Sequence, residues 1–135
     1  MPSIIRFREV TDAYTTWSLM EPSYENEGPR VTRLCRLDGY VYASVPDGVL
    51  LPEQPEQIIV EEIEIDENLK ARIKAASPQI RIINERVVEM IRERYSITDE
   101  IKMLRLAPSE ETAAYNDYAE DCRAWGRSQK EALGM

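Results

Sequence analysis

Two strand-like runs joined by Asp38-Gly39 constrain the fold of this chain more than any other feature. Residues 31–37 (VTRLCRL) and 40–45 (YVYASV) are rich in the β-branched and aromatic side chains that favour strands. A two-residue Asp-Gly connection between such runs is typical of a type I′ turn, in which both central residues adopt a positive φ. We therefore expect an antiparallel hairpin over residues 31–45.

Neither face of this hairpin is purely apolar. Strict alternation along its first strand places Val31, Arg33, Cys35 and Leu37 on one face and Thr32, Leu34 and Arg36 on the other. Because each face mixes apolar and polar side chains, we expect both faces to be covered. The cover is either the rest of the domain or a partner protein.

Shorter strand-like segments flank the hairpin. Ile4, Ile5 and Phe7 lie in a β-prone run, and residues 58–65 (IIVEEIEI) resume β character after a connector with prolines at 52 and 55. We predict a β-rich N-terminal region with a proline-rich connector over residues 1–57. A strand and a helical module follow over residues 58–135.

From Asp66 onward the pattern becomes helical. Apolar residues at positions 80, 83, 87, 90 or 91, and 95 recur at helical spacing, and Pro108 ends the helix expected over residues 97–106. Ser96 and Asp99 form a variant of the capping box. The expected N-cap residues of the helices are Asp66, Ser77, Ser96 and Ser109. The predicted fold class is α+β, a β-hairpin or small sheet followed by a three- or four-helix bundle.

The last helix carries a seam at spacings of three, four and three residues, formed by Tyr115, Tyr118, Cys122 and Trp125. Such a stripe lies on one face of a helix, and it most often packs into the helix's own bundle. The alternative is a docking face, because tyrosine and tryptophan are favoured interface anchors. We expect Gly126, which follows the seam, to kink or end the helix.

The sequence lacks the residues and motifs that most often carry catalysis. It has no histidine, which removes the commonest general base and zinc ligand, and it has no phosphate-binding or nucleophile motif. Glu61, Glu62, Glu64, Asp66 and Glu67 are candidate cation ligands, but successive strand residues point to opposite faces and do not converge. We expect no catalytic residue, no metal site, no cofactor and no enzyme activity.

The charge and the hydropathy of the sequence limit the classes of partner and location to be expected. A net charge of −8 argues against nucleic acid. No apolar run is long enough to span a bilayer, and the N-terminal residues lack the apolar segment of a secretory signal. Cys35 and Cys122 match no metal or redox spacing and are expected to be free thiols.

The charges are unevenly placed along the chain. Residues 37–69 hold nine acidic side chains and no lysine or arginine, whereas residues 70–105 hold nine basic and five acidic ones. This asymmetry would let the two halves attract each other, or let one copy dock on the next. The alternative is two solvated faces that only keep the chain soluble.

The C-terminal third resembles short proteins encoded among the tail genes of tailed phages and prophages, in particular the tail-fibre assembly chaperone type. That type has an Arg-rich helix, a turn with an acidic residue, a Pro-Ser-acidic helix start and an aromatic final helix. The matching residues are Arg92, Arg94, Asp99, Pro108-Ser109-Glu110, Tyr115, Tyr118 and Arg123. The chain departs from the pattern at Tyr115 (usually Trp), Ala119 (usually Arg) and Cys122 (usually Leu).

The resemblance implies a non-catalytic, phage tail-associated structural or assembly protein that docks to other tail, baseplate or fibre proteins. Apart from the resemblance, a second copy of the chain is a further candidate partner. The candidate partner-binding residues are Tyr115, Tyr118, Cys122, Trp125, Arg92, Arg94 and Arg123. One alternative is a transient tail-fibre chaperone that is not retained in the virion. Another is a small ligand- or metal-binding module. The expected location is the bacterial host cytoplasm during assembly, and the virion tail if the protein is retained.

Overall fold

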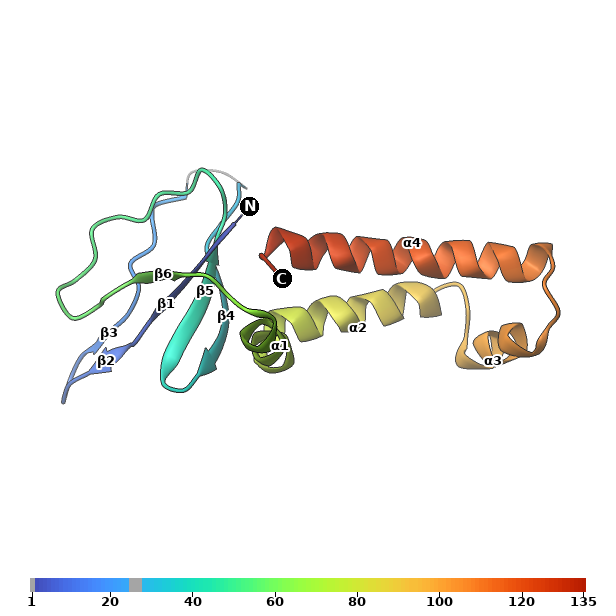
Figure 1. The fold of residues 1–135 in the computed structure, drawn as a ribbon, viewed down its shortest axis with the longest axis horizontal. Helices are drawn as coiled ribbons and strands as arrows, with labels where there is room; N and C mark the ends of the chain where they lie inside the picture. The colour runs from blue at the N-terminus through green and yellow to red at the C-terminus, as the bar shows by residue number, and fades with distance from the viewer. Residues whose placement is uncertain (1, 25–27) are drawn as a thin grey trace. The chain divides into compact units, whose positions relative to one another are not determined.

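A computed structural model describes residues 2–24 and 28–135 and has the expected α+β architecture, with a small antiparallel sheet followed by four helices (Figure 1). The chain divides into two compact units. The β unit comprises Met1–Ile80 and Glu131–Met135, and the helical unit comprises Arg81–Lys130. The boundary predicted between residues 57 and 58 is drawn from composition, whereas these two units are defined by contacts. The predicted boundary therefore stays a prediction.

The main sheet of the β unit has four antiparallel strands. They are β1 (Ser3–Phe7), β4 (Thr32–Leu37), β5 (Tyr40–Val45) and β6 (Glu61–Ile63), and they lie in the order β4-β5-β1-β6. Two further strands, β2 (Val10–Thr11) and β3 (Thr16–Trp17), pair with each other. In this sheet β1 lies between β5 and β6, so the chain's first strand joins the hairpin to the later strand.

The predicted hairpin turn is confirmed. Asp38 has a φ of 52° and Gly39 a φ of 82°, as a type I′ turn requires. The predicted strict alternation along the first strand is wrong. The register shifts between Arg33, opposite Ala43, and Cys35, opposite Tyr42. A bulge at this point brings Leu34 and Cys35 both into buried positions, because the extra residue breaks the two-residue period.

Both faces of the hairpin are covered, as expected. All five residues of Val41–Val45 are buried, so side chains on both faces of β5 are covered. Phe7 is fully buried and contributes about 1.5–3 kcal/mol of hydrophobic stabilisation. The buried cluster on its face comprises Ile5, Phe7, Leu19, Val31, Val41, Ala43, Val45 and Ile58.

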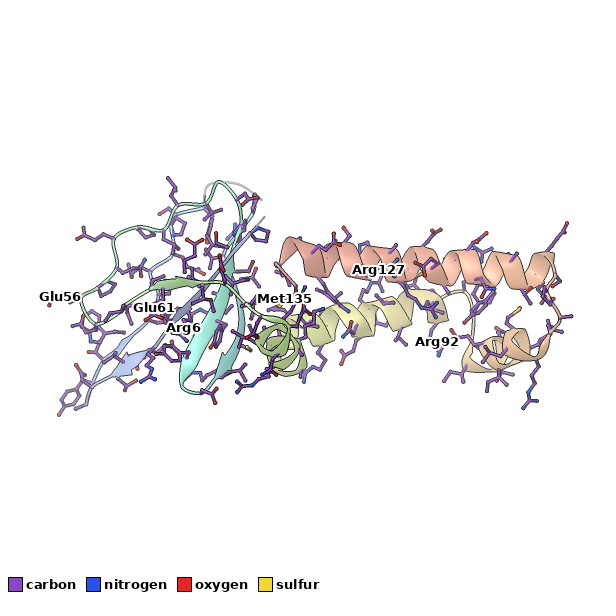
Figure 2. The ribbon with its side chains drawn as sticks, viewed as in Figure 1. Arg6, Glu56, Glu61, Arg92, Arg127 and Met135 are labelled. Atoms are coloured by element: carbon purple, nitrogen blue, oxygen red, sulfur yellow. The ribbon has the colours of Figure 1, made fainter. Side chains whose placement is uncertain are left out.

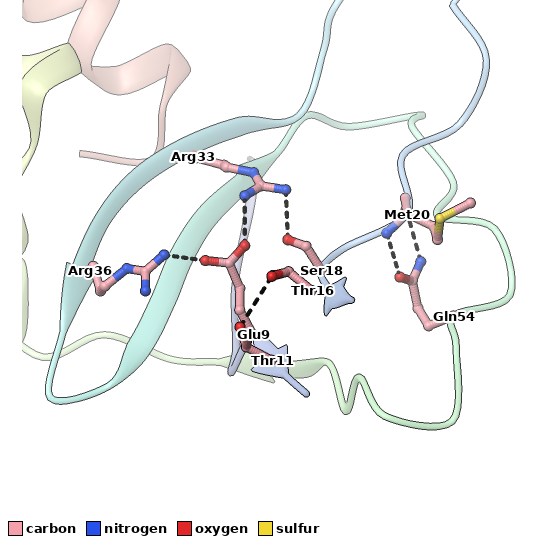
Figure 3. Close-up of polar contacts among 8 residues, drawn as sticks. All are labelled: Glu9, Thr11, Thr16, Ser18, Met20, Arg33, Arg36 and Gln54. Atoms are coloured by element: carbon pink, nitrogen blue, oxygen red, sulfur yellow. Dashed lines mark hydrogen bonds and ion pairs between the residues drawn. The ribbon is translucent and has the colours of Figure 1, made fainter. Parts of the chain in front are cut away.

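Polar contacts fasten the loops to this sheet (Figure 3). Glu9 pairs with Arg36 and with Arg33, which also donates to Ser18 Oγ at 3.0 Å. The hydrogen bond from Ser18 is the largest influence on the pKa of Glu9. Together with the two arginine charges it outweighs desolvation, so the pKa of Glu9 lies below its ordinary value.

The four helices begin at the expected caps. They are α1 (Glu67–Ala76), α2 (Pro78–Arg92), α3 (Ile97–Arg105) and α4 (Glu110–Ala132). Leu69 N donates to Asp66 Oδ1 at 2.7 Å, and the reciprocal capping box of Ser96 and Asp99 is complete. Ser77 and Ser109 accept from the backbone N–H groups three residues on, at 3.4 and 3.3 Å.

Gly126 does not end the last helix, which continues to Ala132. The glycine is buried, and a Cβ at this position would lie 2.6 Å from Val87 Cγ2 on α2. In the helical unit α4 lies beside α2 (Figure 1), and Gly126 permits their close approach. The expectation of a kink or end came from helix propensity, which tertiary packing overrides here.

We predict that Gly126→Ala destabilises the protein by about 1–2 kcal/mol, even though alanine favours a helix by about 1 kcal/mol. The added methyl must displace Val87, whose β-branched side chain has little rotamer freedom in a helix. Denaturant unfolding monitored by circular dichroism measures the change. Val87→Ala should rescue part of the loss in the double variant, and a Gly126→Ala protein more stable than the parent would contradict this packing.

Candidate functional site

The aromatic seam faces the interior of the helical unit. Tyr115 is 8% exposed and Cys122 is 2% exposed, whereas Tyr118 and Trp125 are half-buried. The buried cluster comprises Ile91, Tyr115, Ala119 and Cys122, packed against Val87, Met90, Tyr95, Met103 and Tyr118. Most of the seam is thus covered by α2 and by Met103 of α3.

Tyrosine rings fill the end of this cluster. Tyr95 meets Tyr115 edge to face with ring centroids 5.0 Å apart, and it meets Tyr118 in a tilted arrangement at 5.8 Å. Such geometries add to the hydrophobic gain of burying the rings. The Tyr118 hydroxyl donates to the Met90 carbonyl at 2.6 Å, so this half-buried polar group is satisfied by the backbone of α2.

One carboxylate joins the three helices. Glu100 of α3 accepts a hydrogen bond from the Tyr115 hydroxyl of α4 at 2.9 Å. Its other oxygen lies 2.8 Å from Arg92 Nη1 at the end of α2, where Figure 2 labels Arg92. We call Glu100, Arg92 and Tyr115 the Glu100 tie. The hydrogen bond from Tyr115 to the charged carboxylate is stronger than one between neutral groups.

The remaining candidate residues lie around this tie in different ways. The Arg94 guanidinium stacks over Tyr118 at 5.0 Å from the ring centroid. Arg123 is exposed, and its charge favours the ionised form of Glu100. The structure therefore gathers Arg92, Arg94, Tyr115 and Tyr118 at one end of the helical unit, and of these four it leaves Arg94 exposed to solvent.

The electrostatics of the tie favour a charged Glu100. Desolvation, the largest influence, raises the pKa of Glu100. The ion pair with Arg92, the hydrogen bond from Tyr115 and the charge of Arg123 together outweigh it, so the pKa lies below its ordinary value. The pKa of Tyr115 is raised by burial first and by its bond to Glu100 second. The pair thus holds one carboxylate and one neutral phenol at neutral pH, which is an arrangement for structure and not for proton transfer.

The β unit has a groove that no sequence motif indicated. It has a volume of about 310 Å³, and we call it the Tyr40 groove. Its lining residues are Arg8, Val10, Tyr40, Gln57, Ile59 and Glu61. They converge from the segment that leads from β1 into β2, from the start of β5, and from the segment that leads into β6. That convergence depends on strand order and could not be read from spacing along the chain.

Two arginines stack on one aromatic ring at this groove. The guanidinium groups of Arg6 and Arg8 lie 4.4 and 4.3 Å from the Tyr40 ring centroid. Arg6 also pairs with Glu61 through Nε at 2.7 Å, and Figure 2 labels these two residues side by side on the sheet. Arg8 is exposed and forms no ion pair with any residue that the structure describes.

Within residues 2–24 and 28–135, no group of three or more His, Cys, Asp or Glu side chains is arranged to hold a metal ion. The two cysteines are buried free thiols, as expected. None of the described helices combines the length and the apolar character that crossing a membrane demands.

Comparison of the chain with protein-family models, with curated protein sequences and with solved structures finds no match.

We predict that Glu100→Gln lowers the free energy of unfolding by about 1–2 kcal/mol at pH 7, because it removes the charged acceptor of the tie. The pKa of Glu100 is lower in the folded protein, so its contribution is present above its unfolded pKa of about 4.3. It is lost as the pH falls through the folded pKa. Denaturant unfolding from pH 7 to pH 3 should show the two proteins converging in acid.

Asp117→Asn is the matched control for this experiment. Asp117 is exposed on α4 and forms no ion pair with a described residue. We expect this variant to follow the parent protein at every pH. A constant difference between parent and Glu100→Gln from pH 7 to pH 3 would show that the carboxylate charge is not what stabilises the tie.

Proposed function

We propose that this chain is a non-catalytic, phage tail-associated structural or assembly protein that works by docking to tail, baseplate or fibre proteins. The proposal rests on the resemblance of the C-terminal third to tail-fibre assembly chaperone-type proteins. The observation that carries the docking step is the Tyr40 groove, where exposed apolar side chains lie beside an arginine without an ion-pair partner among the described residues.

The groove suits a segment of another protein better than it suits a small molecule. Ile59 on its wall is 73% exposed. Exposed apolar side chains beside a charge are typical of protein contact surfaces. A fitting partner segment carries one apolar side chain to cover Ile59 and one carboxylate to meet Arg8.

An unpaired strand edge lies next to this groove. β6 ends the four-stranded sheet and pairs with β1 alone among the described strands. Glu61, the first residue of β6, lines the groove. A partner segment entering the groove therefore arrives beside backbone groups at which extended peptides can add to a sheet.

The aromatic seam has a different part in this proposal from the one its residue types suggested. Tyr115 and Cys122 are buried, so they stabilise the helical unit and do not present a docking face. Arg94 and Arg123 stay exposed at the surface above them, and they remain candidate contact residues.

Binding to the tail, baseplate and fibre proteins encoded beside this chain tests the proposal. We expect one of them to bind the purified protein in isothermal titration calorimetry. Ile59→Asp and Arg8→Glu should each weaken binding about tenfold or more, since each removes one of the two complementary contacts. Leu50→Asp is the matched control, because Leu50 is also exposed in the β unit but does not line the groove.

Two outcomes would contradict the proposal. One is a protein that binds none of these candidates yet gains thermal stability from a small ligand. The other is binding that all three variants leave unchanged, which would exclude the groove. If binding is found, mass spectrometry of purified virions separates a retained component from a chaperone that leaves before assembly is complete.

A further inference from the structure

Helix α3 presents an apolar stripe to solvent. Ile97, Ile101 and Leu104 are 61%, 46% and 83% exposed. Their spacing of four and three residues places them on one face of the helix. No residue of α3 is buried, and exposed apolar surface arranged along one element usually marks an interaction site. We call these three residues the α3 stripe.

The exposure of the stripe does not mean that α3 is left unpacked against the helical unit. Another side of α3 already holds the helix in place, through the Glu100 tie, through Met103 in the buried cluster, and through Lys102, whose Nζ lies 3.6 Å from Glu111 Oε1. With these contacts made, turning the stripe inward would break each of them. The outward position of the stripe therefore belongs to the folded state.

The charged side chains of α3 leave the stripe uncovered. Asp99 accepts from Ser96 N at the N-cap, Glu100 belongs to the tie and Lys102 pairs with Glu111, so these three are engaged within the chain. An antiparallel pair of α3 helices opposes the two helix dipoles favourably, whereas a parallel pair aligns them.

The apolar register matches the same arrangement. With a two-fold axis near Ile101, Ile101 meets its own copy, and Ile97 of each chain meets Leu104 of the other. The helical unit as a whole does not oppose the approach of a second copy. It holds nine basic and ten acidic residues, whereas the β unit holds eight and fifteen.

We propose that α3 is a self-association surface, through which two copies of this chain pack antiparallel along Ile97, Ile101 and Leu104. The contact is isologous, and its small area is typical of a weak, concentration-dependent dimer. The proposal concerns the helical unit and does not rest on the docking proposed for the β unit, so either can fail alone.

Sedimentation equilibrium over a range of protein concentrations tests self-association. We expect the average mass of the parent protein to rise from 15.6 kDa toward twice that value. Ile101→Asp should weaken association by about tenfold or more, because it buries two carboxylates against each other at the axis. Leu50→Asp, an equally drastic change on the exposed surface of the β unit, should associate like the parent.

Circular dichroism of Ile101→Asp guards against loss of fold as the cause. A parent protein that stays at 15.6 kDa at its highest soluble concentration would overturn the proposal. So would a folded Ile101→Asp variant that dimerises like the parent.

Cysteine cross-linking tests the antiparallel register. Under mild oxidation we expect Ile101→Cys to form a disulfide-linked dimer with itself, because residue 101 meets its own copy. Ile97→Cys and Leu104→Cys should form a mixed dimer with each other and not with themselves. The native cysteines are buried, so the parent protein is the control that should not cross-link. Self-linked dimers of Ile97→Cys and Leu104→Cys would overturn the antiparallel arrangement.

A charge exchange gives an independent test of the orientation. Thr98 and Arg105 lie on the same flank of the stripe, so each should face the other across an antiparallel pair. Thr98→Glu should strengthen the dimer, because it sets a carboxylate opposite Arg105 of the other copy, and adding Arg105→Glu to it should abolish the gain. A folded Thr98→Glu variant that associates no more strongly than the parent would contradict this pairing.

Discussion

The arrangement of the three helices in the helical unit depends on the carboxylate of Glu100. It accepts a hydrogen bond from Tyr115 on α4 and pairs with Arg92 on α2, so a single side chain of α3 meets both longer helices. α3 has no buried residue of its own, and besides this tie Met103 and Lys102 hold it. The direction in which α3 presents its apolar stripe follows from that attachment.

Local signals predicted the elements well. The Asp38-Gly39 turn, the reciprocal capping box and the other N-caps each depend on residues within a few positions of one another, and all are confirmed. The α+β class followed from the change of apolar period near Asp66. These features are legible because the backbone at a turn or a helix start is decided by its own few side chains.

Features that depend on distant residues were missed or misjudged. The bulge at Leu34 depends on pairing with β5, and the role of Gly126 depends on Val87 some forty positions earlier. Arg92 and Tyr115 appeared in the sequence as candidate contact residues, while Glu100, which joins them, gave no signal beyond its place in an acidic first turn. The Tyr40 groove is assembled from three segments whose adjacency only the strand order supplies.

The aromatic seam and the exposed surfaces of the protein thus have separate roles. Aromatic side chains that would serve well as interface anchors are used to close the helical unit, and the surfaces left for partners are the α3 stripe and the Tyr40 groove. The net charge also differs between the two units. The β unit carries most of the negative charge, with Arg8 as a local exception, and the helical unit is close to neutral.

The central claim, that the seam is interior, is tested most directly by the reactivity of Cys122, which lies in its middle. Native protein is treated with a thiol reagent, and the labelled peptide is followed by mass spectrometry so that Cys35 is counted separately. A thiol that is 2% exposed should react only when the helices open, orders of magnitude more slowly than in denaturant. Labelling of Cys122 in the native protein as fast as in the unfolded chain would contradict the account.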